Sequence, residues 1–132
     1  MLIHQIRQSP DIYMSYTEEL LAKADAVIPR VTLEDFNNDS LPKVMIDVRQ
    51  QEELKASGTI QGSIHIPKGV IEFRLNNNDE ISFDTSVYVF CAVGVRSAIA
   101  GYNLKKVGYQ KVFNLVGFQD ILDQGAEKQV LT

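Results

Sequence analysis

The hydrophobic positions of this chain change their spacing several times, which predicts alternating helices and strands. Near the N-terminus, Ile12, Tyr16, Leu20 and Val27 recur at helix-like intervals, with charged residues on another side. Further along, short apolar runs have the length and composition of buried strands. Strands are predicted at residues 43–48, 63–67, 87–90 and 111–115, and helices at 11–26, 32–36, 50–57, 69–75, 97–107 and 118–122. This order is typical of the α/β class, a parallel sheet covered by helices on both faces.

Several of these predicted boundaries coincide with residues that start or stop helices. Ser9, Pro10 and Asp11 together form a helix start signal, and Pro29 ends the first helix. Thr32, with an acidic residue three positions later, predicts a capping box. The boundaries therefore agree with the periodicity.

The length of 132 residues suits one domain with a hydrophobic core. We expect residues 1–28 to form an N-terminal helical extension that packs on the domain, and residues 29–132 to form the domain itself. Two interpretations of the extension stay open. It either contributes packing alone or serves as an arm for a partner or for oligomerisation.

Composition and charge exclude several classes of function. The formal net charge is −4 and no cluster of Lys and Arg is present, which argues against nucleic-acid binding. The apolar runs are too short to cross a bilayer, and the N-terminus lacks the apolar core of a signal peptide, so we expect neither a membrane segment nor export. His4 and His65 are isolated, and with one cysteine they give no metal-ligand spacing, so no metal or cofactor is expected. A single cysteine also forms no internal disulfide, which favours a reducing, cytoplasmic setting.

The most informative segment begins at Cys91, the only cysteine of the chain. It ends an apolar run and precedes a short loop that contains Gly94 and Arg96 and leads into a helical pattern. Backbone N–H groups at a helix start and a nearby guanidinium both stabilise a thiolate and hold an anion beside it. A lone buried cysteine is often inert, but this loop favours a nucleophile. The candidate catalytic residue is Cys91, and the candidate substrate-binding residues are Ala92, Val93, Gly94, Val95, Arg96 and Ser97.

This loop resembles the active-site loop of the rhodanese family of sulfurtransferases. Three further segments resemble that family, in its order: Asp47-Val48-Arg49 with Glu52 and Glu53, residues 58–67, and residues 107–112. Together the matches cover residues 29–125. The chain departs from the family at residues 116–121, which begin Val116-Gly117, where the family often has two glycines and a tryptophan.

The resemblance implies a parallel five-stranded sheet with helices on both faces, and Cys91 as the nucleophile. The thiolate would take sulfane sulfur from thiosulfate or a persulfide donor, and cyanide or a thiol would remove it from the resulting persulfide. Loop amides would hold the terminal sulfur, and Arg96 would favour the anionic donor. Because the chain has no second cysteine, the acceptor must be another molecule, which includes a protein acceptor as one possibility.

Three alternatives are weighed against this hypothesis. Phosphatases and arsenate reductases with a similar loop place five residues between Cys and Arg, whereas four separate Cys91 from Arg96, which favours sulfur over phosphate. A persulfide carrier that serves a protein partner, with little small-molecule turnover, stays open. An inactive regulatory domain usually lacks the cysteine. We expect Asp47 and Arg49 to cap the next helix and pair with Glu52 or Glu53, and His65 to be structural.

Overall fold

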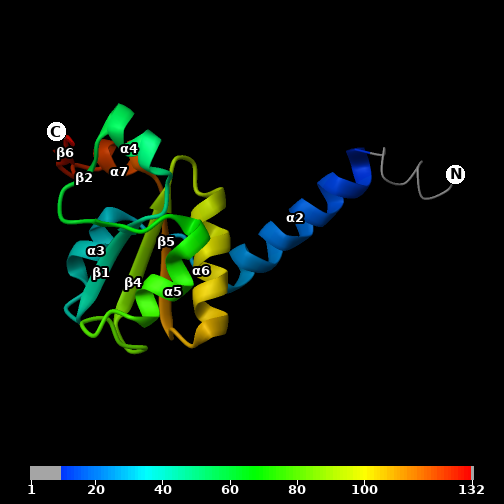
Figure 1. Cartoon of the computed structure of the whole chain (residues 1–132), viewed down its shortest axis with the longest axis horizontal. Coiled ribbons are helices and arrows are strands. Elements are labelled where there is room, and N and C mark those ends of the chain that lie inside the picture. The colour runs from blue at the N-terminus through cyan, green and yellow to red at the C-terminus, as the bar shows by residue number, and fades with distance from the viewer. Residues whose placement is uncertain (1–9, 132) are drawn as a thin grey trace, which may run out of the picture.

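The computed structural model describes the backbone of residues 10–131 and the side chains of residues 16–131 (Figure 1). Ser9 of the helix start signal and His4 lie outside this range. The helices are α2 (Pro10–Val27), α3 (Leu33–Asn38), α4 (Gln51–Ser57), the 3-10 helix η1 (Lys68–Val70), α5 (Ile71–Asn76), α6 (Val95–Val107) and α7 (Phe118–Asp123). The strands are β1 (Lys43–Asp47), β2 (Thr59–Ile60), β3 (Ile64–His65), β4 (Ser86–Cys91), β5 (Lys111–Gly117) and β6 (Lys128–Gln129).

The central sheet has four parallel strands in the order β3-β1-β4-β5. The α/β class with a parallel sheet is therefore confirmed, with four full strands where five were expected. At the β5 edge a single parallel bridge joins Arg30 to Asn114. Pro29 has no N–H to donate and Thr32 already caps α3, so the extended segment between them is too short to form a strand. Strands β2 and β6 form a separate antiparallel pair that the sequence pattern did not predict.

The side chains of β4 alternate between the two faces of the sheet, as its pleat requires. Val87, Val89 and Cys91 belong to one buried cluster, and Tyr88 and Phe90 belong to another. The first cluster also contains residues of α5 and α6, namely Ile71, Leu75, Ala100 and Leu104, and the second contains residues of α3 and α7, namely Leu33, Phe118 and Ile121. The alternation therefore places the Cys91 side chain on the face that α6 covers.

The loop between β4 and α6 lies at the carboxyl-terminal edge of the sheet, at the top of Figure 1. Cys91 ends β4 and is in register with Gly117, the last residue of β5. Helix α7 begins directly after Gly117. Ligands of parallel α/β folds bind at this edge, so the topology brings the start of α6, the end of β5 and the start of α7 around one cysteine.

Helix α2 contacts the domain through its last turns. Ala24 and Ile28, which immediately follows the helix, are buried, and Ile28 packs on Gly101 of α6, where a Cβ would lie 3.2 Å from its side chain. Tyr16, further toward the N-terminus, is 71% exposed. Figure 1 shows this part of α2 running outward from the domain. Both interpretations of the extension therefore stay open.

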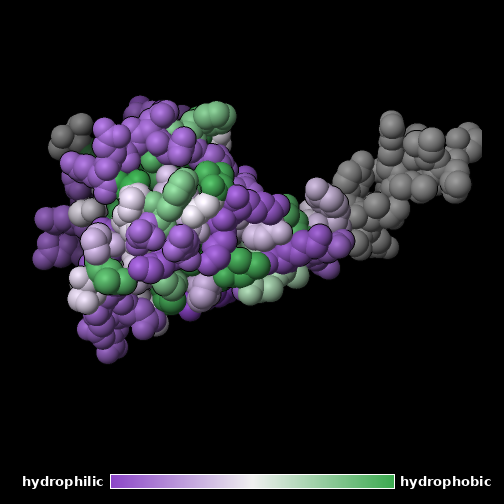
Figure 2. All heavy atoms as spheres, turned by 90° about the horizontal axis from the view of Figure 1, so that it is seen from below, coloured by the Kyte–Doolittle hydropathy of each residue, from purple (hydrophilic) through white to green (hydrophobic). Residues whose placement is uncertain are grey.

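The end of the molecule opposite the Cys91 loop is seen in Figure 2. Its apolar atoms form separate spots among hydrophilic ones. Within residues 10–131, the helices are all too short or too polar to span a lipid bilayer.

Candidate active site

The loop after Cys91 turns at Gly94, whose φ of 97° lies in the left-handed region that favours glycine. A Cβ at Gly94 would also lie only 2.7 Å from Cγ1 of Val116. The turn directs the Gly94 N–H to the Cys91 Sγ at 3.1 Å, and the Ser97 N–H donates to the same sulfur at 3.4 Å. The structure thus brings two of the predicted loop amides to the thiol.

The pKa of the Cys91 thiol results from two opposing effects. Burial acts to raise it, because the side chain has no exposed surface. Hydrogen bonds from the Ser97 hydroxyl and from the N–H groups of Ser97, Gly94 and Val93 act to lower it, and they outweigh burial. The pKa therefore lies below its ordinary value, which increases the fraction of nucleophilic thiolate at neutral pH.

Ser97 and Asn114 form a buried pair behind the sulfur. The Ser97 hydroxyl donates to Asn114 Oδ1 at 2.8 Å and lies 3.4 Å from the Cys91 Sγ. Asn114 Nδ2 donates to the Gly94 carbonyl at 3.1 Å, which fixes the orientation of the amide. Since Asn114 Oδ1 also accepts the Val116 N–H at 2.9 Å, the Ser97 proton can turn to a thiolate without leaving that oxygen unpaired.

Replacing Ser97 with alanine should raise the pKa of Cys91, because one donor to the thiolate is lost. The rate of alkylation of Cys91 by iodoacetamide rises with pH as the thiolate forms. We expect its midpoint to move upward by about half to one pH unit in Ser97→Ala, the size of one net hydrogen bond. Ser82→Ala, in the exposed loop before β4, serves as a matched control. An unchanged midpoint in Ser97→Ala would show that the hydroxyl does not stabilise the thiolate.

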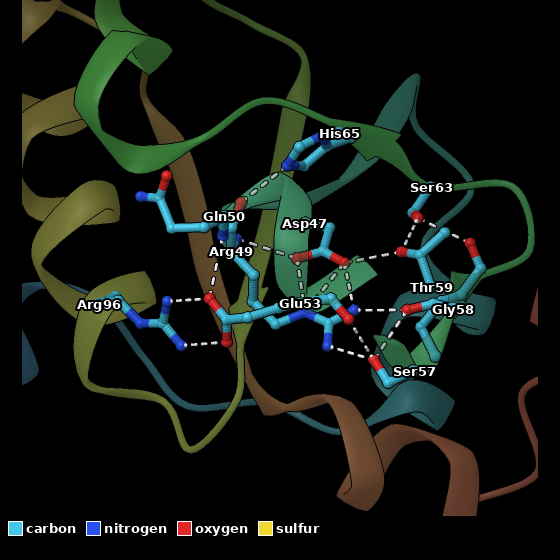
Figure 3. A network of polar contacts seen from close by, with 11 residues as sticks. Asp47, Arg49, Gln50, Glu53, Ser57, Gly58, Thr59, Ser63, His65 and Arg96 are labelled. Carbon is cyan, nitrogen blue, oxygen red and sulfur yellow. Dashed lines mark hydrogen bonds and ion pairs between the residues drawn. The ribbon is translucent and has the colours of Figure 1, made fainter. Parts of the chain in front are cut away.

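Arg96 pairs with Glu53 of α4. Its two terminal nitrogens donate to Glu53 Oε1 at 2.5 Å and Oε2 at 2.8 Å (Figure 3). The hydrogen bond from Arg96 is the main reason that the pKa of Glu53 falls to about 2. The Gln50 N–H also donates to Glu53, at 3.0 Å. One carboxylate therefore holds both the start of α4 and the arginine of the active-site loop.

Asp47 and Arg49 form a buried ion pair of their own (Figure 3). Arg49 donates to both Asp47 oxygens at distances from 2.8 to 3.2 Å, and it donates to the Gly58 carbonyl at 2.7 Å. The expectation that they pair with Glu52 or Glu53 is wrong, because the Asp47 carboxylate lies only two residues before Arg49 and accepts its hydrogen bonds directly. His65 lies beside this network and its Nε2 contacts the Arg49 carbonyl at 2.7 Å, which fits a structural role.

The end of β5 supports the active-site loop from the side. Val116 has a φ of 77°, a strained value for a β-branched residue, and its N–H is held by Asn114. At Gly117 a Cβ would lie 2.7 Å from the Ala92 carbonyl oxygen. Backbone of β5 thus packs directly on backbone of the loop, which explains why a glycine is needed at this position.

Replacing Gly117 with alanine should reduce sulfur transfer, because the added Cβ pushes on the Ala92 carbonyl. Its φ of −122° suits any residue, so the effect is steric. We expect at least about a tenfold loss of kcat/KM, since small displacements of reacting groups cost that much. Gly69→Ala is the matched control, because its Cβ meets nothing within 4 Å. Equal activity of the two variants would contradict a supporting role for Gly117.

The accessibility of the loop residues differs sharply from that of the thiol. Cys91 and Ser97 are 0% exposed, and Gly94 is buried. Val93 is 72% exposed and Val95 is 38% exposed. The thiol is thus shielded from solvent, while two apolar side chains of the loop that follows it lie at the surface.

The sequence interpretation missed Asn114 and the ion pair between Glu53 and Arg96. Asn114 lies within a predicted strand, where a buried polar side chain in an apolar run was the only signal. Glu53 was recognised within a motif, but its partner Arg96 lies 43 positions away. Such a pair can be recognised in a sequence only when the spatial arrangement of the strands and helices is known.

Comparison with known proteins identifies the family to which the chain belongs. The model of the rhodanese-like domain matches residues 32–120. The chain belongs to the rhodanese-like domain family. The resemblance found in the sequence is thereby confirmed.

Three relatives illustrate the range of this rhodanese-like family. The "Putative sulfur carrier protein YrkF" of Bacillus subtilis is 40% identical over 102 residues, which are 70% of this chain and 50% of that protein. The chain thus spans about half the length of this relative. A solved rhodanese with anions from E. coli is 30% identical with a TM-score of 0.54, over 60% of this chain and 91% of that one. The polysulfide-sulfur transferase homodimer of Wolinella succinogenes has a TM-score of 0.70 over 90% of each chain, and at 24% identity it shows the fold alone. Membership of the rhodanese-like family supports sulfur transfer in general as the chemistry of this chain.

Proposed function

We propose that this rhodanese-like chain is a sulfurtransferase that carries sulfane sulfur on Cys91 and passes it to a thiophilic acceptor. The observation that supports this most is the convergence of the Gly94 and Ser97 N–H groups on the Cys91 Sγ. They stabilise a thiolate there, and the same loop offers its amides to a second sulfur bound to the first.

The reaction divides into two displacements. The Cys91 thiolate attacks the outer sulfur of thiosulfate, the sulfur–sulfur bond of the donor breaks, and its electron pair leaves with sulfite. Cys91 is then a persulfide anion. Cyanide or a thiolate attacks the terminal sulfur, the new sulfur–sulfur bond breaks, and the Cys91 thiolate is restored. No oxidant is needed, and no general base is needed when the thiolate already exists.

The test of this proposal is turnover with small donors and acceptors. The purified chain is given thiosulfate, or an aryl thiosulfonate as a second donor, with cyanide as acceptor, and thiocyanate is measured. We expect thiocyanate to form with multiple turnovers per chain. Turnover no higher than that of a Cys91→Ser variant with both donors would contradict a small-molecule enzyme.

A second candidate function is supported by two observations. One relative is named as a "Putative sulfur carrier", and the loop after Cys91 presents the exposed apolar residues Val93 and Val95. In this candidate, a protein donor loads Cys91 and a protein acceptor unloads it. Stable persulfide on Cys91 of the purified protein, with negligible thiosulfate turnover, would favour the carrier over the enzyme.

The free thiol of Cys91 also supports an inference about the cellular compartment in which the chain works. Cys91 is a free thiol, and sulfur transfer requires that it return to that state after each cycle. We infer that the chain works in a reducing, cytoplasmic setting. Cell fractionation tests this, and recovery of the protein outside the cytoplasm would contradict it.

A further inference from the structure

The arginine of the active-site loop is held by a carboxylate through two of its nitrogens. Arg96 uses two nitrogens on the two oxygens of Glu53 in a bidentate pair, the geometry that binds a guanidinium most strongly. Figure 3 shows the two side chains facing each other across the gap between α6 and α4. A guanidinium held this way offers little attraction to an incoming anion.

A second arginine of this network is engaged in the same manner. Arg49 is buried against Asp47 and points its remaining donors at Ser57 and Gly58. Each of the two arginines is therefore matched by one carboxylate, while the Cys91 thiolate itself adds a negative charge.

We propose that Glu53 selects the charge class of the sulfur donor by neutralising Arg96. The inference rests on Cys91 being the sulfur-accepting nucleophile. With the pair intact, a donor with two negative charges meets no net positive charge from Arg96, so donors with one negative charge or none are preferred. Glu53 is thus a positioning residue that acts through Arg96 and does not touch the donor.

Replacing Glu53 with glutamine tests this inference, because the amide keeps the shape and the acceptor oxygen for the Gln50 N–H while removing the charge. Two donors are compared: thiosulfate, which carries two negative charges and leaves as sulfite, and an aryl thiosulfonate, which carries one and leaves as the sulfinate. We expect Glu53→Gln to lower the KM for thiosulfate about three- to tenfold, the effect of one nearby unit charge on a dianion. The KM for the thiosulfonate should fall less, and kcat should change little with either donor.

The matched control is Glu52→Gln, which removes the same charge from an exposed neighbour on α4. It should leave both KM values near those of the unmodified chain. In an Arg96→Gln background, the gain from Glu53→Gln should be smaller, because the repulsion from Glu53 is removed but no freed guanidinium is present to bind the donor.

Four outcomes would overturn the inference. The first three are an equal response to Glu53→Gln and Glu52→Gln, an equal change for the two donors, and a gain that is equally large without Arg96. A rise in KM for thiosulfate with an unchanged unfolding midpoint would also overturn it, since Glu53 would then assist dianion binding. Failure of the proposed function looks different, because no variant and neither donor would then load sulfur on Cys91.

Discussion

Replacing Cys91 with serine should lower sulfur transfer by at least about a thousandfold, the scale seen when a covalent nucleophile is removed. A serine hydroxyl stays protonated at neutral pH, and the loop amides that lower the pKa of the thiol cannot ionise it. No other thiol can replace Cys91 as the nucleophile, because the chain has one cysteine. Thiocyanate formation from each donor with cyanide measures the effect.

The control for this variant is its stability. Serine is close to cysteine in size and can accept the same hydrogen bonds from Gly94 and Ser97, so the denaturant midpoint should shift little. Activity of Cys91→Ser within tenfold of the unmodified chain would rule out Cys91 as the nucleophile. If Cys91→Ser were much less stable than the unmodified chain, its loss of activity could not be attributed to the missing nucleophile. The Cys91→Ala variant would then be measured instead.

Replacing Asp47 with alanine should be the most destabilising substitution near the site, by about 3–5 kcal/mol, the cost of leaving a buried charge unpaired. Arg49 is 3% exposed and Asp47 is 0% exposed. The Asp47 carboxylate also accepts the Thr59 hydroxyl at 2.7 Å. Without it the guanidinium loses its counter-charge and the hydroxyl loses its acceptor. Urea unfolding of the two proteins measures the difference in free energy.

Asp25→Ala provides the comparison for this prediction. Asp25 pairs with Arg30 at 3.5 Å on the surface, and exposed pairs contribute less than about 1 kcal/mol. A free energy of unfolding for Asp47→Ala within about 1 kcal/mol of that of Asp25→Ala would show that Arg49 finds another partner or reaches water.

The sequence was most informative where local spacing decides the structure. The order of apolar runs and helical patterns predicted β1, β4, α6 and β5, and the capping box at Thr32 is present as expected. The loop after Cys91 was equally readable, because a strand end, a glycine and a helix start lie within seven residues of sequence. Local chemistry of this kind needs no knowledge of the rest of the fold.

Interactions between distant segments could not be predicted in the same way. The pairing of Arg96 with Glu53 depends on how α4 and α6 meet at the sheet edge, and the sequence instead suggested that Glu53 pairs with Asp47 or Arg49. The expected fifth strand is reduced to a single bridge at Arg30, since Pro29 and the cap at Thr32 leave no room for a longer one. Strands β2 and β6 have two residues each, too few for any alternation to show.

The position of Val116 shows the limit of family comparison. Its departure from the glycine that the family often has was visible in the sequence. That its φ is positive, that Asn114 holds its N–H, and that its side chain packs on Gly94 all required the structure. Val116 is thus part of the wall of the active-site loop, beside Gly94.

The central claim is that Cys91 accepts and carries a sulfur atom, and mass spectrometry of the intact chain tests it most directly. The chain is incubated with thiosulfate or an aryl thiosulfonate, separated from the donor, and digested to locate any added mass. We predict the added mass of one sulfur atom on the peptide that contains Cys91, lost again on treatment with cyanide. Absence of that added mass with every donor, from protein whose Cys91 still reacts with iodoacetamide, would contradict the account.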